Sequence, residues 1–158
     1  RLLLQIAVLI HACGKFISMK NSNECGYTLI MSTEIIGLSH LEREIIANVV
    51  RYNIRDFDYD MMQLETEAGQ DLAGVSDRTA ITILIAKLTA ILRLANSMDK
   101  THKSKLIDCR MAVREGQLVI TTGYKGDLAL ESASFEQKAA FFEEIFGIRP
   151  VLKQKRRV

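Results

Sequence analysis

The run ITILIAKLTAILRLA, residues 81–95, is apolar on nearly every side. A helix with this pattern is typical of a position surrounded by other helices, because a helix on the surface keeps one polar face. A buried strand is the alternative, but an apolar run of this length without glycine or proline favours a helix. The run therefore predicts a helical bundle that has residues 81–95 near its centre.

A membrane span is not expected in the same region. The run is interrupted by Thr82, Lys87, Thr89 and Arg93, and it falls short of the roughly 20 apolar residues that cross a bilayer.

Helical spacing of apolar residues extends over the first 105 residues. Residues 2–10 carry one apolar stripe, residues 27–31 predict a short helix before Gly37, and Ser39 with Glu42 forms a capping-box pattern at the start of residues 41–50. Part of the segment 56–75 is expected to be helical, with Gly69 and Gly74 as interruptions.

After Lys105 the period of the apolar residues changes to two, which is typical of strands. Residues 107–114 and 117–122 predict a hairpin that turns at Glu115 and Gly116. A short strand is expected around 128–130, a helix that opens at a second capping box, Ser134 to Gln137, and ends at Gly147, and an edge strand over 148–152. The fold class is mainly α: a helical domain over 1–105, followed by a small α+β subdomain over 106–158 that leans on it.

Composition excludes several classes of protein. The formal net charge is only +2, so total charge favours neither nucleic acid nor a membrane surface. Three widely spaced cysteines, Cys13, Cys25 and Cys109, indicate reduced thiols in the cytoplasm. Residues 56–77 are acidic without Lys or Arg, and 149–157 are basic without an acid. The chain opens on Arg1 inside an apolar pattern, so we expect it to be part of a longer protein.

Basic residues are the main chemical feature, and they centre on the run 100–105, where the long helix is expected to end. Cations there stabilise a helix C-terminus, which is the simpler explanation. If they converge with arginines elsewhere, they form a groove for a polyanion. Because the chain has no Trp and few Tyr near these positions, stacking of bases is not expected and phosphate chains fit better. The predicted polyanion-binding residues are Lys100, His102, Lys103, Lys105, Arg51, Arg55, Arg93 and Arg110.

No catalytic residue can be assigned from the sequence. A metal centre for phosphate hydrolysis needs several imidazoles and carboxylates around the ion, and this chain has three histidines, of which only His11 ends an apolar helix. The pattern of a serine nucleophile elbow and the glycine loops that hold phosphate are absent. We expect no metal and no other cofactor in this chain.

Five motifs in a fixed order resemble the C-terminal half of the exopolyphosphatase/guanosine pentaphosphate phosphatase family. The motifs are LIHACGKFI, GYTLI, GLSHLEREIIANVVRYN, LTAILRLANSMDKTHKSK, and a hairpin followed by FEQKAAFFEEIFG. The resemblance implies a helical module similar to the HD phosphohydrolases and then a small α/β cap. It also implies that catalysis, with magnesium, belongs to two N-terminal lobes that are missing here.

The chain departs from the family where metal ligands would be expected. Family members often keep a histidine followed by an acid at His11-Ala12, a histidine cluster at Ser22, Asn23 and Cys25, an Arg-Tyr-His at 51–53, and a Leu-Ala-Asp at 94–96. This chain has Asn53 and Asn96 at the last two, so every departure removes a ligand. We interpret LIHACGKFI as a metal motif that is retained for its helix, its turn at Gly14 and its packing.

The leading hypothesis is a non-catalytic region that contributes polyanion binding and dimer contacts to a cytoplasmic phosphoric-anhydride hydrolase. The expected partners are the N-terminal lobes of the same protein, polyphosphate or guanosine pentaphosphate, and a second copy of the chain; no membrane or nucleic-acid partner is expected. The alternatives are an autonomous HD-type metal-dependent phosphohydrolase and a pure protein-interaction module. Stoichiometric bound metal would support the metal-dependent phosphohydrolase. Absence of salt-sensitive polyphosphate binding would leave only the interaction module.

Overall fold

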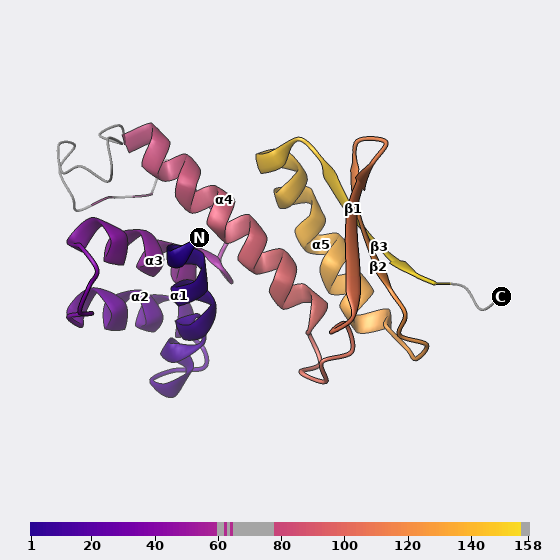
Figure 1. Cartoon of the computed structure of the whole chain (residues 1–158). Helices are drawn as coiled ribbons and strands as arrows, with labels where there is room; N and C mark the ends of the chain where they lie inside the picture. Colours follow the sequence, from indigo (N-terminus) through magenta and orange to yellow (C-terminus); the bar gives the residue numbers. More distant parts are fainter. Residues whose placement is uncertain (60–61, 63, 65–77, 156–158) are drawn as a thin grey trace. The chain divides into compact units, whose positions relative to one another are not determined.

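The chain divides into two compact units, Arg1–Leu92 and Arg93–Val158, in a computed structural model that describes residues 1–59, 62, 64 and 78–155 (Figure 1). The long helix α4, Arg78–Met98, contributes residues to both units. The change of apolar period placed a boundary after residue 105, whereas packing divides the chain within α4. Its Arg93 already belongs with the second unit and stacks on the ring of Phe141, 4.7 Å from the ring centre.

The first unit is a helical bundle. It contains α1 (Leu2–Ile10), the 3-10 helix η1 (Cys13–Phe16), α2 (Ser22–Ser32), α3 (His40–Tyr52) and the first part of α4. The apolar face of α3 is buried almost completely and packs with α4 residues that include Ile81, Ile85 and Leu92. The predicted helices over 2–10 and 41–50 are therefore present, and α2 is longer than the predicted 27–31.

The predicted capping box at the start of α3 is confirmed. The Ser39 hydroxyl accepts from the Glu42 backbone N–H at 3.2 Å, and the Glu42 carboxylate accepts from the Ser39 backbone N–H at 2.8 Å. Two donors at the helix start are thereby satisfied by one pair of side chains. Gly37 adopts a φ of 89°, but it lies in the connection beyond Ser32 and does not end α2.

Helix α4 is 21 residues long, which exceeds the predicted apolar run, and its length and hydropathy would allow it to cross a bilayer. Half of its most apolar stretch is buried inside the protein. The core side chains on this helix pack against other helices of the first unit, as in the central helix of a soluble protein.

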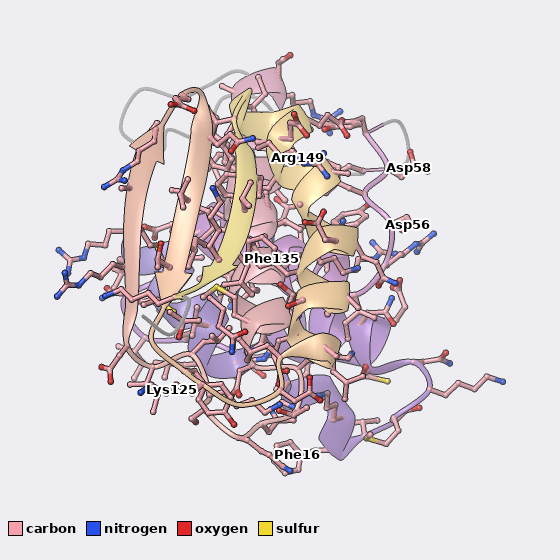
Figure 2. All side chains as sticks on the ribbon, turned by 90° about the vertical axis from the view of Figure 1, so that its right-hand side faces the viewer. Phe16, Asp56, Asp58, Lys125, Phe135 and Arg149 are labelled. Atoms are coloured by element: carbon pink, nitrogen blue, oxygen red, sulfur yellow. The ribbon has the colours of Figure 1, made fainter. Side chains whose placement is uncertain are left out.

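The second unit is a three-stranded sheet with one helix packed on it (Figure 1). Strands β1 (Cys109–Arg114) and β2 (Gln117–Thr122) form the predicted antiparallel hairpin, and β3 (Arg149–Gln154) pairs parallel to β2. Between β2 and β3 lies α5 (Ala129–Phe146). Phe135 points from α5 toward the sheet, where Ile120 is buried as well (Figure 2). The sheet order β1-β2-β3 leaves β1 and β3 as edge strands, as predicted for the strand that carries Pro150.

Two predictions in this unit are wrong. Residues 128–130 form no strand, because α5 already begins at Ala129, and Ser134 therefore lies inside the helix instead of capping it. The helix starts early because the Asp127 carboxylate accepts from the Ala129 N–H at 2.8 Å. The predicted end is confirmed, since Gly147 adopts the left-handed conformation with a φ of 69°.

The fold class is confirmed as a mainly α module followed by a small α+β unit. The prediction of partial helix over 56–75 lies mostly outside the described residues.

Candidate functional site

The basic run 100–105 forms a structured loop between α4 and β1. Two of its non-glycine residues, His102 and Ser104, have φ values of 53° and 51°, in the left-handed region. The Asp99 carboxylate accepts from the Ser104 N–H at 2.8 Å, and the Asp99 carbonyl accepts from the His102 N–H at 3.0 Å. Such strained residues persist only where surrounding contacts hold them. Lys100, His102 and Lys103 are exposed on this loop.

The buried carboxylate of Glu131 binds two residues of this loop. Glu131, in the first turn of α5, has no exposed surface. It accepts a short hydrogen bond from the Thr101 hydroxyl and a second from the Lys105 ammonium, 3.1 Å away, which also donates to the Asp127 carbonyl at 2.9 Å. Lys105 is therefore an internal cation that joins the loop to α5. This contact between residues far apart in the sequence could not be seen in the sequence pattern.

The environment of Glu131 favours its ionised form. The hydrogen bond from Thr101, followed by a backbone hydrogen bond at Glu131 and then by the hydrogen bond and charge of Lys105, lowers the pKa of the Glu131 carboxyl from 4.5 to about 2. Burial acts in the opposite direction and is outweighed. The Glu131 carboxylate is thus charged at neutral pH.

Two predicted arginines in the first unit bind one carboxylate. The Nε of Arg51 donates to Glu24 Oε1 at 3.0 Å, and its Nη2 lies 2.9 Å from Glu24 Oε2. Arg55 donates to the same carboxylate at 3.0 Å. Burial alone would raise the pKa of Glu24, but the hydrogen bonds and charges of the two arginines hold it below its usual value. Arg51 also stacks on Tyr27, 4.9 Å from the ring centre. The cluster links α2 to the end of α3.

The eight predicted polyanion-binding residues divide between the two units. Arg51 and Arg55 belong to the first, and the other six belong to the second. Among these six, the structure brings Lys100, His102, Lys103 and Lys105 together on one loop, whereas Arg93 stacks on Phe141. Their common role in binding a polyanion remains a prediction.

Arg110 lies elsewhere in the second unit, in a hollow of about 290 Å³ on the face of the sheet. Arg114 and Lys155 line the same hollow, together with Ala112, Val119 and Thr121. Lys155 was not among the residues predicted to bind a polyanion. The alternation of residues through β3, continued to position 155, places it on this face and could have indicated it.

The positions at which a degenerate metal motif was predicted lie at or near the ends of helices. His11 follows the last residue of α1, and its Nδ1 lies 2.7 Å from the Val8 carbonyl oxygen, to which it donates in the tautomer protonated there. Asn53 caps the end of α3, and Asn96 lies in the last turn of α4. Among residues 1–59, 62, 64 and 78–155, no three His, Cys, Asp or Glu side chains are close enough to hold a metal ion.

Gly14, in the turn after His11, lies closely packed against α2. A side chain at Gly14 would collide with the backbone of α2, with its Cβ touching the Ser22 carbonyl oxygen and lying 2.5 Å from the Gly26 nitrogen. Gly26 is close-packed in turn, because its Cβ would lie 3.0 Å from Val50. Close packing at these two glycines thus places η1 against α2, and α2 against α3.

Cys13 and Cys109 do not have the environment of nucleophiles. Cys13, Cys25 and Cys109 are free thiols. Burial raises the pKa of Cys13 and of Cys109, and the charge of Asp108 adds to the effect at Cys109. A raised pKa lowers the thiolate fraction, and the thiolate is the reactive form.

The fold and these clusters define a helical module with a small α+β unit that presents cations and, in the part described, brings together no metal-binding group. The chain belongs to the Ppx/GppA phosphatase family: residues 1–139 match the family model for Ppx/GppA phosphatase, domain III. No curated protein matches the chain.

Proposed function

We propose that this chain is a non-catalytic region of an exopolyphosphatase-type hydrolase that contributes to polyanion binding and to dimer contacts. Membership in the Ppx/GppA phosphatase family supports the reaction class. Catalysis, with its magnesium ion, is then the task of N-terminal lobes, and the polyanion is inorganic polyphosphate or guanosine pentaphosphate. The three free thiols favour a cytoplasmic location. No metal is required of this chain.

The observation that carries the proposal is the loop 99–105. It exposes Lys100, His102 and Lys103, while Lys105 and Thr101 anchor it to the buried Glu131. A loop that is already ordered loses less conformational freedom when a ligand binds, so its cations bind phosphate groups at lower cost. Lys105 therefore acts as a positioning residue, and the exposed cations make the contacts.

Changing Lys100 and Lys103 to glutamine is expected to weaken polyphosphate binding without lowering thermal stability. Each lysine lost removes roughly one unit from the slope of log K against log salt concentration. Isothermal titration of the 158-residue chain with polyphosphate at several salt concentrations measures both effects.

The double variant K15Q/K20Q is the matched control, because these exposed lysines lie in the first unit and the net charge changes equally. Equal weakening by both pairs would show that only total charge matters and would contradict a site at the loop.

Dimer contacts are proposed at the exposed apolar side chains around β1. Ile107, which precedes β1, and Met111 and Val113 within it are 77%, 61% and 65% exposed. Apolar side chains that are exposed together are typical of a protein–protein contact surface. We expect the chain to reach the mass of two copies as its concentration rises, and the variant M111K/V113K to remain a monomer. Light scattering after size exclusion measures the mass. The control I36K changes a fully exposed residue of the first unit; a dimer unaffected by M111K/V113K would contradict the contact at β1.

A further inference from the structure

We propose that the face of the sheet turned away from α5 is a second phosphate-binding subsite, formed by Arg110, Arg114, Thr121 and Lys155. The choice of a phosphate chain as ligand rests on the proposed function. The location rests on the hollow itself, which none of the loop residues 100–105 lines.

The cationic side chains that line this hollow have no polar partner in the part of the chain that the structure describes. The side chains of Arg110, Arg114 and Lys155 make no hydrogen bond or ion pair with any residue in the described part of the chain. Other arginines do have such partners: Arg51 and Arg55 bind Glu24, and Arg149 binds Glu136 and Glu143. Three unpaired cations at one hollow repel one another, and an anionic ligand removes that repulsion.

The three strands contain neither acidic nor aromatic residues. Strands β1, β2 and β3 contain no Asp or Glu, so no carboxylate within the strands competes with a bound anion. They also contain no Phe, Tyr or Trp, so bases of a nucleic acid have no ring to stack on. A phosphate chain without bases fits this face better than a single-stranded nucleic acid.

The pairing of β1 with β2 shows which residues lie at each end of the hollow. Arg110 pairs with Thr121, and Ala112 pairs with Val119. Lys155 lies near the first of these pairs, because its N–H donates to the Thr122 carbonyl at 3.0 Å. At ~3.3 Å per residue, the Cα atoms of Arg110 and Arg114 are about 13 Å apart along β1. The small side chains of Ala112 and Val119 leave the space between them open.

This geometry suits an elongated ligand with several anionic groups. One group binds between Arg110, Lys155 and the Thr121 hydroxyl, and another binds Arg114 further along the strand. Arginine offers two parallel N–H donors to each phosphate, which a lysine cannot. A single phosphate ion reaches only one end of the hollow, so affinity is expected to rise with chain length.

Protection of an edge strand is the competing explanation, since charged side chains on an edge discourage pairing with other chains. That role accounts for charge on each edge strand separately, β1 on one side and the end of β3 on the other. It does not account for the position of Lys155 at the same hollow as Arg110 and Arg114, because protection of two separate edges does not require their cations to come together.

The test compares the intact 158-residue chain with the variant R110Q/R114Q/K155Q, using orthophosphate, tripolyphosphate and long-chain polyphosphate as ligands. Loss of these three cationic contacts is expected to weaken the binding of long-chain polyphosphate roughly 10- to 100-fold, which corresponds to about 1.4–2.8 kcal/mol. The control K15Q/K20Q/K87Q removes the same charge from exposed positions of the first unit and is expected to bind at least tenfold more tightly than the sheet variant. Thermal melting establishes that both variants fold.

Three further measurements test the location and the chemistry of the site. In amide NMR spectra, tripolyphosphate is expected to shift Ala112, Val119 and Thr121 in the unmodified chain. The variant A112E, which places a carboxylate in the middle of the hollow, is expected to abolish those shifts. R110K/R114K keeps the charge and is expected to recover only part of the affinity.

The outcomes separate the subsite from the proposed function. If the unmodified chain binds no polyphosphate, the proposed function fails. If it binds, but the sheet variant binds as well as the control, the subsite is overturned while the loop site stands. Equal binding of a single-stranded oligonucleotide, lost in the same variant, would overturn the choice of a phosphate chain.

Discussion

Replacing Glu131 with glutamine is expected to lower the free energy of unfolding by roughly 2–4 kcal/mol, because removing one partner of a buried ion pair leaves the other charge uncompensated. Glu131 has no exposed surface, and the Lys105 ammonium and the Thr101 hydroxyl both donate to it. Denaturant titration of the intact chain measures the loss. The control is E136Q on the same helix, an exposed carboxylate that binds Arg149, for which at most about 1 kcal/mol is expected.

The loss should depend on pH in a defined direction. The pKa of Glu131 is lowered from 4.5 to about 2 on folding, so its contribution is complete above pH 4.5 and disappears as the pH falls toward 2. The difference in unfolding free energy between the wild-type chain and E131Q should therefore be constant near neutral pH and should shrink in acid. A difference that grew as the pH fell would contradict an ionised Glu131.

The same variant separates charge from loop order. Removing a carboxylate makes the chain more positive, so charge alone predicts tighter polyphosphate binding by E131Q. If Glu131 instead holds the loop that presents Lys100 and Lys103, its loss disorders the loop and weakens binding. We expect the weaker binding, and E136Q serves as the control because it makes the same charge change away from the loop.

Local sequence patterns predicted correctly those helix ends that depend on residues close by in the chain. The capping box at Ser39 and the left-handed Gly147 involve residues within one helical turn, and both were predicted. The start of α5 was not, although Ser134 to Gln137 has the same capping pattern. Capping bonds form only where a helix begins, and the contacts of Asp127 and Glu131 place that beginning earlier.

The candidate site shows the same limit. Which cations occur in the chain was visible in the sequence, but which of them are free was not. Lys105 looks like its neighbours Lys100 and Lys103, yet it binds a carboxylate 26 residues away. Arg51 and Arg55 bind Glu24 across 27 and 31 residues. Pairing at such separations is set by tertiary packing, so a count of basic residues overstates the charge available to a ligand.

Replacing Gly14 with alanine is expected to destabilise the first unit by roughly 2–4 kcal/mol, because a methyl group there forces two backbone segments apart. The added Cβ would collide with the Ser22 carbonyl oxygen and lie 2.5 Å from the Gly26 nitrogen, and neither can move without moving α2. Denaturant titration of the intact chain measures the effect. The control is G123A, where a Cβ would have no atom within 4 Å and no positive φ is required.

Comparing G14A with H11A distinguishes a packing role of the stretch LIHACGKFI from a role in metal binding. If the stretch LIHACGKFI is retained for packing, G14A should be much more harmful than H11A, which removes one hydrogen bond to the Val8 carbonyl and about 1 kcal/mol. If the stretch still served a metal, H11A would abolish metal binding and bound metal would stabilise the wild-type chain. Melting with and without zinc or manganese, for both variants, distinguishes these cases. An H11A chain that loses a metal-dependent rise in melting temperature would overturn the packing interpretation, whereas a large loss confined to G14A would support it.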